Sequence, residues 1–106
     1  MGYIRHNAII ATTWRPDSAD SLVEYARGLR MEAVAGNKRM NGYITVCINP
    51  DGSKEGWEDS NYGDQARESI KDWIRARENM WEWCEVAYGH DDHVAAVTDS
   101  AWMDAP

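Results

Sequence analysis

Two segments of the chain carry apolar residues at helical spacing, and each segment has a single apolar stripe. The first segment lies within residues 17–34, and its stripe is formed by Leu22, Ala26, Leu29 and Ala33. The second begins after residue 64, and its stripe is formed by Ala66, Ile70, Trp73 and Ile74, with Lys71 and Arg75 outside it. A helix with one apolar stripe cannot bury it alone, so both helices must pack on another layer of structure.

The other regular segments favour a β-sheet as that layer, because they are short and rich in β-branched and aromatic residues. The expected strands span residues 3–14, 43–49, 81–88 and 93–100. A Pro-Asp-Gly-Ser turn at 50–53 permits a further short strand at 54–57. In strand 81–88, alternation places on one side Trp81, Trp83, Glu85 and Ala87.

These elements predict an α+β fold, with a small, mostly antiparallel sheet and two helices packed on one face. Asp17 is a candidate N-cap of the first helix, which should run for about four turns. Ser60 or Asn61 is a candidate N-cap of the second helix. The order β-α-β-β-α-β-β is close to the ferredoxin-like, split-βαβ arrangement. We expect a single compact domain over residues 1–106, with one sheet face open for ligand binding or for a second copy.

The first strand has no purely apolar side, because His6 alternates with Arg5 and Asn7. A buried arginine is costly unless it is paired, so we expect His6 to face the helices. Arg5 and Asn7 would then lie on the open face beside Tyr3. The structural interpretation is a hydrogen-bonded core histidine and a solvated arginine. The functional interpretation is that Arg5 binds a phosphate or carboxylate, Asn7 binds a base edge, and Tyr3 stacks on a ring.

Two basic segments are further candidates for binding an anion. Thr13 and Arg15 lie just before the first helix, whose free N–H groups can bind an anion, although ordinary capping is the favoured explanation of these residues. Lys38 and Arg39 lie in the loop 36–42, which has glycine at both ends. That loop is either a solvated basic loop or a lid that closes over an anion.

Two aromatic residues lie in the glycine-rich segment 50–64. Trp57 and Tyr62 stand there on irregular backbone, where exposed aromatic rings can stack on a ligand. Trp57 could instead fill the edge of the core. Because exposed rings on such backbone can stack on a ligand, Trp57 and Tyr62 are both candidate ligand-binding residues.

The charge of the chain restricts its binding partners. The formal net charge is −7, which argues against binding to duplex nucleic acid through its phosphates. Residues 1–50 contain six Lys and Arg against four Asp and Glu, whereas residues 51–106 contain five against fourteen. A small anionic, nucleotide-like ligand would therefore find its cationic partners in the first half.

No catalytic motif stands out, so enzymatic activity is left open and is not favoured. His90 and His93 flank two aspartates, but this predicted turn supplies too few firm ligands for a structural zinc site. We expect no metal and no cofactor. The sequence contains no apparent leader and no apolar run long enough to span a membrane, so we expect a cytoplasmic protein without membrane contact. Cys47 and Cys84 should then be reduced.

Three stretches resemble a family of small bacteriophage proteins: "GYIRHNAIIATTW", "GYITVCINPDGSKEGW" and "EDSNYGDQAR". The resemblance covers somewhat over a third of the chain. It implies a setting in which small phage proteins act against host defence. Some of these proteins bind nucleotide messengers without cleaving them, and others occupy the nucleic-acid groove of a host protein, as some anti-CRISPR proteins do.

Three functions follow from these observations. The favoured hypothesis is a homo-oligomeric protein that sequesters a nucleotide-derived immune signal without cleaving it, in the host cytoplasm. The alternative is an acidic inhibitor of a nucleic-acid-binding defence protein, which rests on the charge of residues 51–106. Against this alternative, basic residues interleave with the acids of the second helix, namely Arg67, Lys71, Arg75 and Arg77. The third hypothesis is a small phosphoesterase.

Overall fold

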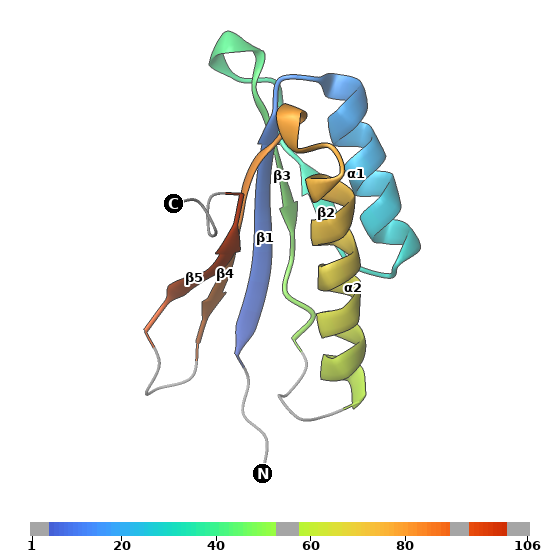
Figure 1. Ribbon diagram of the computed structural model, residues 1–106, viewed down its shortest axis with the longest axis vertical. Coiled ribbons are helices and arrows are strands. Elements are labelled where there is room, and N and C mark those ends of the chain that lie inside the picture. The colour runs from blue at the N-terminus through green and yellow to red at the C-terminus, as the bar shows by residue number, and fades with distance from the viewer. Residues whose placement is uncertain (1–4, 53–57, 90–93, 102–106) are drawn as a thin grey trace.

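The computed structural model describes residues 5–52, 58–89 and 94–101, which form a five-stranded sheet and two helices (Figure 1). Strands and helices alternate along most of the chain. Their bounds are β1 (His6–Thr13), α1 (Pro16–Gly28), β2 (Ala33–Ala35), the 3-10 turn η1 (Met40–Gly42), β3 (Ile44–Ile48), α2 (Glu58–Arg75), the 3-10 turn η2 (Glu78–Met80), β4 (Glu82–Tyr88) and β5 (Ala96–Ser100).

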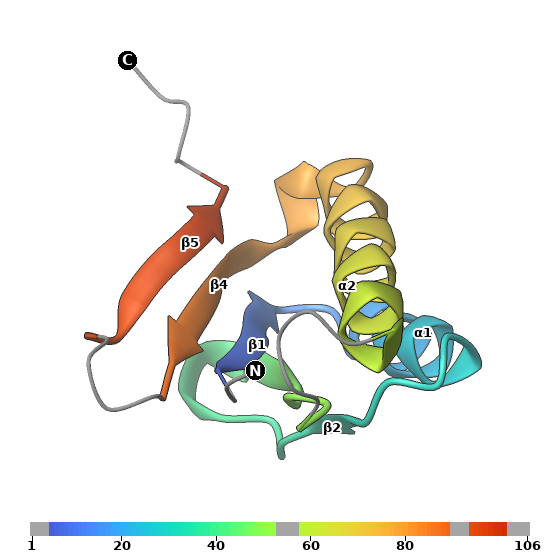
Figure 2. The same ribbon diagram turned by 90° about the horizontal axis from the view of Figure 1, so that it is seen from below.

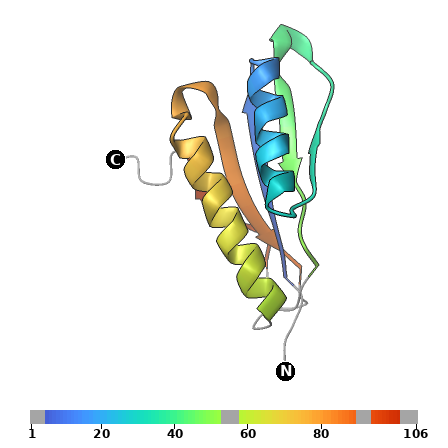
Figure 3. The ribbon, with the colours of Figure 1, turned by 90° about the vertical axis from the view of Figure 1, so that its right-hand side faces the viewer.

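The strand order in the sheet is β2-β3-β1-β4-β5, and every neighbouring pair is antiparallel. Because β3 lies between β1 and β2, those two strands run parallel to each other, as in a split-βαβ unit. Both helices cover the same face of the sheet (Figures 2 and 3). The predicted α+β fold is therefore confirmed, and β5 extends the ferredoxin-like order by one strand.

The first helix is shorter than its apolar spacing predicts. It ends at Gly28, and Arg30 adopts a left-handed backbone with a φ of 64°. The N–H of Met31 then bonds to the carbonyl oxygen of Ala26 at 3.0 Å. Ala33, assigned above to the helical stripe, instead begins strand β2, which the sequence did not reveal. The possible strand at 54–57 lies outside the described residues.

The predicted helix caps are wrong. Arg15 occupies the N-cap position of α1 and makes no side-chain capping bond, while Pro16 begins the helix. Proline suits this position because its missing N–H would have no partner there. Asp17 lies inside the first turn, where its negative charge stabilises the helix by interacting with the positive N-terminal end of the helix dipole. Ser60 and Asn61 both lie within α2, which begins at Glu58.

The core lies between the helices and the sheet. Its fully buried aliphatic side chains come from both layers, and burying each one contributes about 1.5–3 kcal/mol. They are Ile9, Leu22, Val46, Ile48, Ile70 and Ile74. The predicted alternation of β4 is confirmed, because the four residues assigned to one side are buried there: Trp81, Trp83, Glu85 and Ala87.

The predicted orientation of β1 is wrong. Ile9, Ala11 and Thr13 are fully buried, so the side of the strand that also carries Arg5 faces the helices. His6 lies on the opposite, open face, where its ring is 5.2 Å from that of Tyr88. The expected cost of turning Arg5 inward does not arise, because its guanidinium lies near the end of the sheet. There it donates to the carbonyl oxygens of Gly89 and Val94, at 3.1 and 3.2 Å.

Candidate ligand groove between the two helices

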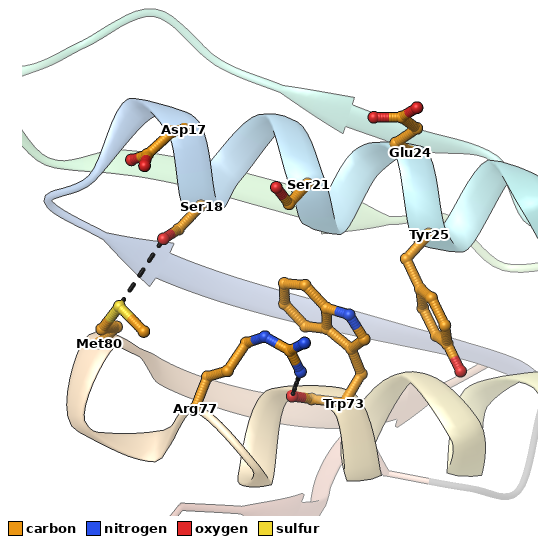
Figure 4. A pocket seen from close by; sticks show the side chains of 8 residues that line it. All are labelled: Asp17, Ser18, Ser21, Glu24, Tyr25, Trp73, Arg77 and Met80. Carbon is orange, nitrogen blue, oxygen red and sulfur yellow. Dashed lines mark hydrogen bonds between the residues drawn. The ribbon is translucent and has the colours of Figure 1, made fainter.

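A groove of about 430 Å³ lies between α1 and α2, which run side by side over the sheet (Figures 3 and 4). Residues on one flank of each helix line it, together with Arg77 in the turn after α2 and Met80 of η2. They are Asp17, Ser18, Ser21, Glu24, Tyr25, Trp73, Arg77 and Met80. Ser18, Ser21 and Tyr25 follow one another at helical spacing, which brings them to the same side of α1. We call this feature the helix groove.

Two aromatic rings meet in the helix groove. Tyr25 extends from α1 toward α2, and Trp73 extends from α2 toward α1 (Figure 4). Their ring centroids are 5.8 Å apart and their planes differ by 26°, so the rings are stacked. Behind them, Trp73 also contacts the buried Trp81 edge-on, with 6.2 Å between centroids. This contact holds Trp73 in place, while Tyr25 remains 37% exposed to solvent.

Arg77 lies over the indole ring of Trp73, with its guanidinium carbon 3.9 Å from the ring centroid. Its Nη1 also donates to the backbone oxygen of Trp73 at 2.9 Å. Among the described residues, no carboxylate is within ion-pair distance of Arg77. A guanidinium that is positioned by a ring and a backbone oxygen still has other N–H donors for an anionic group.

The α1 side of the helix groove is polar. The hydroxyl of Ser18 contacts the sulfur of Met80 at 3.7 Å, and Ser21 adds a second hydroxyl. Asp17 is paired with Arg15 at 3.6 Å, and the carboxylate of Glu24 points away from Trp73 (Figure 4). The groove therefore offers a ring surface, a guanidinium and hydroxyl groups, with its acids turned aside or partly neutralised.

The cationic side chains predicted to bind a ligand do not converge. Arg5 stands just before β1, at the end of the sheet from which that strand starts (Figure 1). Arg15 follows the opposite end of β1, and Lys38 and Arg39 are exposed in the β2–β3 loop at the same end. The first strand therefore separates Arg5 from the other three residues.

The remaining predicted residues have structural contacts or lie outside the described part. Thr13 is fully buried, and its hydroxyl accepts a bond from the N–H of Arg15 at 3.3 Å. Asn7 is half-buried on the helix-facing side of β1. The hydroxyl of Tyr62 donates to the carbonyl oxygen of Leu29 at 2.6 Å. Tyr3 and Trp57 lie outside the described residues.

The sequence analysis did not predict the residues of the helix groove to bind a ligand. Trp73 was assigned to the apolar stripe of its helix, which accounts for its contact with Trp81. Tyr25 and Arg77 lie beside the stripes, where a sequence offers only exposed aromatic and charged residues. Tyr25 and Arg77 line the groove only because these flanks of the two helices face each other. A local sequence pattern does not show which flanks meet.

A second polar cluster lies between α2 and the β4–β5 hairpin. Arg67 and Lys71 are each only 4% exposed, although helical spacing placed Lys71 outside the apolar stripe. The Nζ of Lys71 contacts Glu85 and Asp99, each at 3.1 Å. Arg67 contacts the same Glu85 at 3.6 Å. These cations are therefore internal partners of acids and are not part of a solvated helix face.

The contacts of this cluster shift the pKa values of Lys71 and Asp99. Burial lowers the pKa of Lys71, but hydrogen bonds to Glu68, Asp99 and Glu85 outweigh burial, and the net pKa lies above its ordinary value. Burial likewise raises the pKa of Asp99, but hydrogen bonds from Lys71 and Arg75 outweigh it and hold the pKa below its ordinary value. Both groups are therefore stabilised in their charged forms.

In the described part of the chain, no group of three or more His, Cys, Asp or Glu side chains could hold a metal ion. The His-Asp-Asp-His segment at 90–93 lies outside that part. A membrane-spanning helix would have to be longer and more apolar than any helix among the described residues.

No family model matches the sequence, and no curated protein matches it. Among solved structures, a phage SAM lyase in complex with S-methyl-5'-thioadenosine has a similar fold, with a TM-score of 0.48 and 8% sequence identity. The alignment covers 96% of this chain and 94% of that chain.

Proposed function

We propose that this protein binds a nucleotide-derived ligand in the helix groove and sequesters it without cleaving it. The observation that carries the proposal is the arrangement of Tyr25, Trp73 and Arg77, in which two stacked rings lie beside a positioned guanidinium. An aromatic surface can stack on a base, and a guanidinium can bind a phosphate. Sequestration requires only such binding groups.

The dimensions and charges of the helix groove narrow the ligand class. A volume of about 430 Å³ is within the range of small-molecule sites in proteins. Arg77 is the one cation that lines the groove among the described residues, and Asp17 and Glu24 lie on its α1 side. This balance favours a nucleotide with one phosphate, or a cyclic monophosphate, over a ligand with several adjacent phosphates.

The setting that we propose is action against host defence in the cytoplasm of a phage-infected cell, as the resemblance to small phage proteins implies. The alternative function, an acidic inhibitor of a nucleic-acid-binding protein, has weaker support. Acids on α2 that could imitate phosphates are instead paired with cations of the same helix, as in the pairs Asp64–Arg67 and Glu68–Lys71. The homo-oligomer expected from the sequence involves a different surface, the open face of the sheet.

The test is a binding series by isothermal calorimetry and thermal shift. The ligands are AMP, cyclic AMP, cyclic dinucleotides, orthophosphate and a neutral nucleoside, S-methyl-5'-thioadenosine. We expect the monophosphates to bind best, and the bound ligand to be recovered chemically intact after denaturation. Recovery of a converted product would contradict sequestration, and the absence of binding by every ligand would remove the proposal.

Matched variants locate the site. We expect Arg77→Ala to weaken the bound monophosphate about tenfold or more, because it removes a charge-assisted contact of about 1.5–3 kcal/mol. Arg39→Ala is the matched control, because it removes an exposed arginine that does not line the groove, and it should leave binding unchanged. Tyr25→Ala should also weaken binding, whereas Tyr43→Ala should not, although Tyr25 and Tyr43 are 37% and 38% exposed. Equal effects within each pair would show that the ligand binds elsewhere.

A further inference from the structure

The sheet face opposite the helices carries a transverse row of residues that is apolar across four strands and ends on a serine in the fifth. Ile10 in the central strand pairs with Cys47 on one side and Cys84 on the other. The pairing continues outward from Cys47 to Val34 and from Cys84 to Ser100. Directly paired residues share a face of the sheet, so these five side chains form one transverse row. We call this side of the sheet the open face.

Large apolar side chains of the open face are exposed to solvent. Ile10 is 38% exposed, Val34 51%, Tyr88 40% and Val97 53%. Val86 lies two residues after Cys84 in β4, so both side chains are on the open face. Val97 pairs with Val86 and therefore lies on the same face. Both helices lie on the other side of the sheet (Figure 2), although Val34, in the edge strand β2, also borders a hollow lined by residues of α1. Contiguous apolar surface of this kind is typical of an interaction site in a soluble protein.

The charge on the open face differs from that on the rest of the molecule. At the described strand positions of this face, alternation places one carboxylate, that of Glu82 at the first position of β4, and no Lys or Arg. The whole chain, by contrast, is 27% charged and carries a net charge of −7. Two copies of a chain with this net charge repel each other, and the described strand positions of the open face add only one carboxylate to that repulsion.

We propose that copies of this chain self-associate by packing their open faces together. A surface of mainly apolar and uncharged polar side chains, with one carboxylate at its margin, can pack against a second copy of itself, as a twofold interface requires. Strand spacing and residue rise give a face of roughly 20 Å by 20 Å. Two such faces would bury on the order of 1,000 Å², at the lower limit for specific interfaces, so association should depend on concentration.

The two cysteines provide an internal probe of this interface. Cys47 and Cys84 flank the same residue, so two strand spacings, about 10 Å, separate them. That separation exceeds the reach of a disulfide bond, and both thiols are free. Because both lie in the central row, packing of a second copy should shield them together from a thiol reagent.

The test measures molar mass by sedimentation and light scattering over about 5–500 µM chain. We expect the mass to rise toward twice the 12.1 kDa of one chain. Ile10→Asp and Val97→Asp place a charge on the open face and should remain monomeric. Met40→Asp is the control, because Met40 is 87% exposed in η1 and outside the row. Circular dichroism verifies that each variant is folded.

Thiol labelling of the unmodified chain gives a second measurement that needs no variant. We expect the labelling rates of Cys47 and Cys84 to fall severalfold as the chain concentration rises. The proposal would be overturned if the chain stayed monomeric at all concentrations with unchanged labelling rates. It would also be overturned if Ile10→Asp and Val97→Asp both associated as the unmodified chain does. Tyr25→Ala and Arg77→Ala should self-associate normally, so failure of the groove proposal can be distinguished from failure of this one.

Discussion

Lys71 of α2 and Glu85 of β4 form an ion pair inside the protein, with 3.1 Å between Nζ and Oε1. Their side chains are only 5% and 10% exposed. Thr98 of β5 adds a hydrogen bond of 2.9 Å to the same carboxylate oxygen. The pair therefore attaches one helix to both strands of the β4–β5 hairpin. Such a pair has a large desolvation cost, which its mutual contacts offset only while both partners are present.

Removal of one partner from this pair should destabilise the fold strongly. We expect Lys71→Met to lower the free energy of unfolding by about 3–5 kcal/mol, because it leaves Glu85 buried without its closest cation. The double variant Lys71→Met, Glu85→Leu should recover part of that loss. Urea denaturation measures Lys71→Met, Glu85→Leu and the double variant, with Lys38→Met on the exposed β2–β3 loop as the control. A double variant that loses the sum of the two single effects would show that the residues do not interact.

The same cluster should make acid stability depend on Asp99. Its folded pKa lies below the ordinary 3.8, so its contribution is complete above that value and is lost as the pH falls through the folded pKa. We therefore expect stability to fall less steeply below about pH 4 in Asp99→Asn than in the unmodified protein. The measurement is urea denaturation at each pH, with exposed Asp20→Asn as the control. Parallel acid profiles would contradict this role.

On the alkaline side, Lys71 should determine the loss of stability. Its folded pKa lies above the ordinary 10.5, so its contribution is complete below that value and is lost as the pH rises through the folded pKa. Between the two limits, the contributions of Asp99 and Lys71 should be constant. The difference in Tm between the unmodified protein and Asp99→Asn, or Lys71→Met, should therefore stay constant from pH 5 to pH 9. Thermal unfolding at each pH measures this difference.

Arg5 should be important for stability and not for ligand binding. Its guanidinium bonds to the carbonyl oxygens of Gly89 and Val94, which tie β1 to the ends of the β4–β5 hairpin. We expect Arg5→Ala to cost about 1–3 kcal/mol, and Arg5→Lys to recover only part, since one ammonium cannot reproduce the planar donors. His6→Ala should cost less, because His6 lies on the open face. The opposite ranking in urea denaturation would favour the orientation expected from the sequence.

Two helical glycines should respond in opposite ways to alanine. A Cβ at Gly28 meets nothing within 4 Å, so Gly28→Ala should raise the free energy of unfolding by about 0.4–1 kcal/mol. A Cβ at Gly63 would lie 1.8 Å from Oδ2 of Asp51, whose carboxylate contacts Arg67 at 3.5 Å. Gly63→Ala should therefore destabilise the protein. The Asp51→Ala background should reduce this loss, and an undiminished loss there would exclude the clash as its cause.

The sequence by itself determined the architecture and the kind of most elements, with the short strand β2 as the exception. Apolar residues at helical spacing identified α2 from Ala66 to Ile74, and alternation assigned the buried side of β4. These patterns are local, because each residue's position on a helix or strand follows from the geometry of that element alone. Two single-striped helices and several short strands then leave few ways to bury all the apolar surface.

Only the tertiary structure decided which polar residues are buried and which flanks meet. The side of β1 that faces the helices follows from pairing with β3 and β4, because both sides of this strand mix apolar and polar residues. Lys71 is buried because Glu85 and Asp99, distant in sequence, neutralise it there. The helix groove exists because α1 and α2 bring Tyr25 beside Trp73. Each outcome depends on contacts between distant segments, and such contacts leave no periodic signal in a sequence.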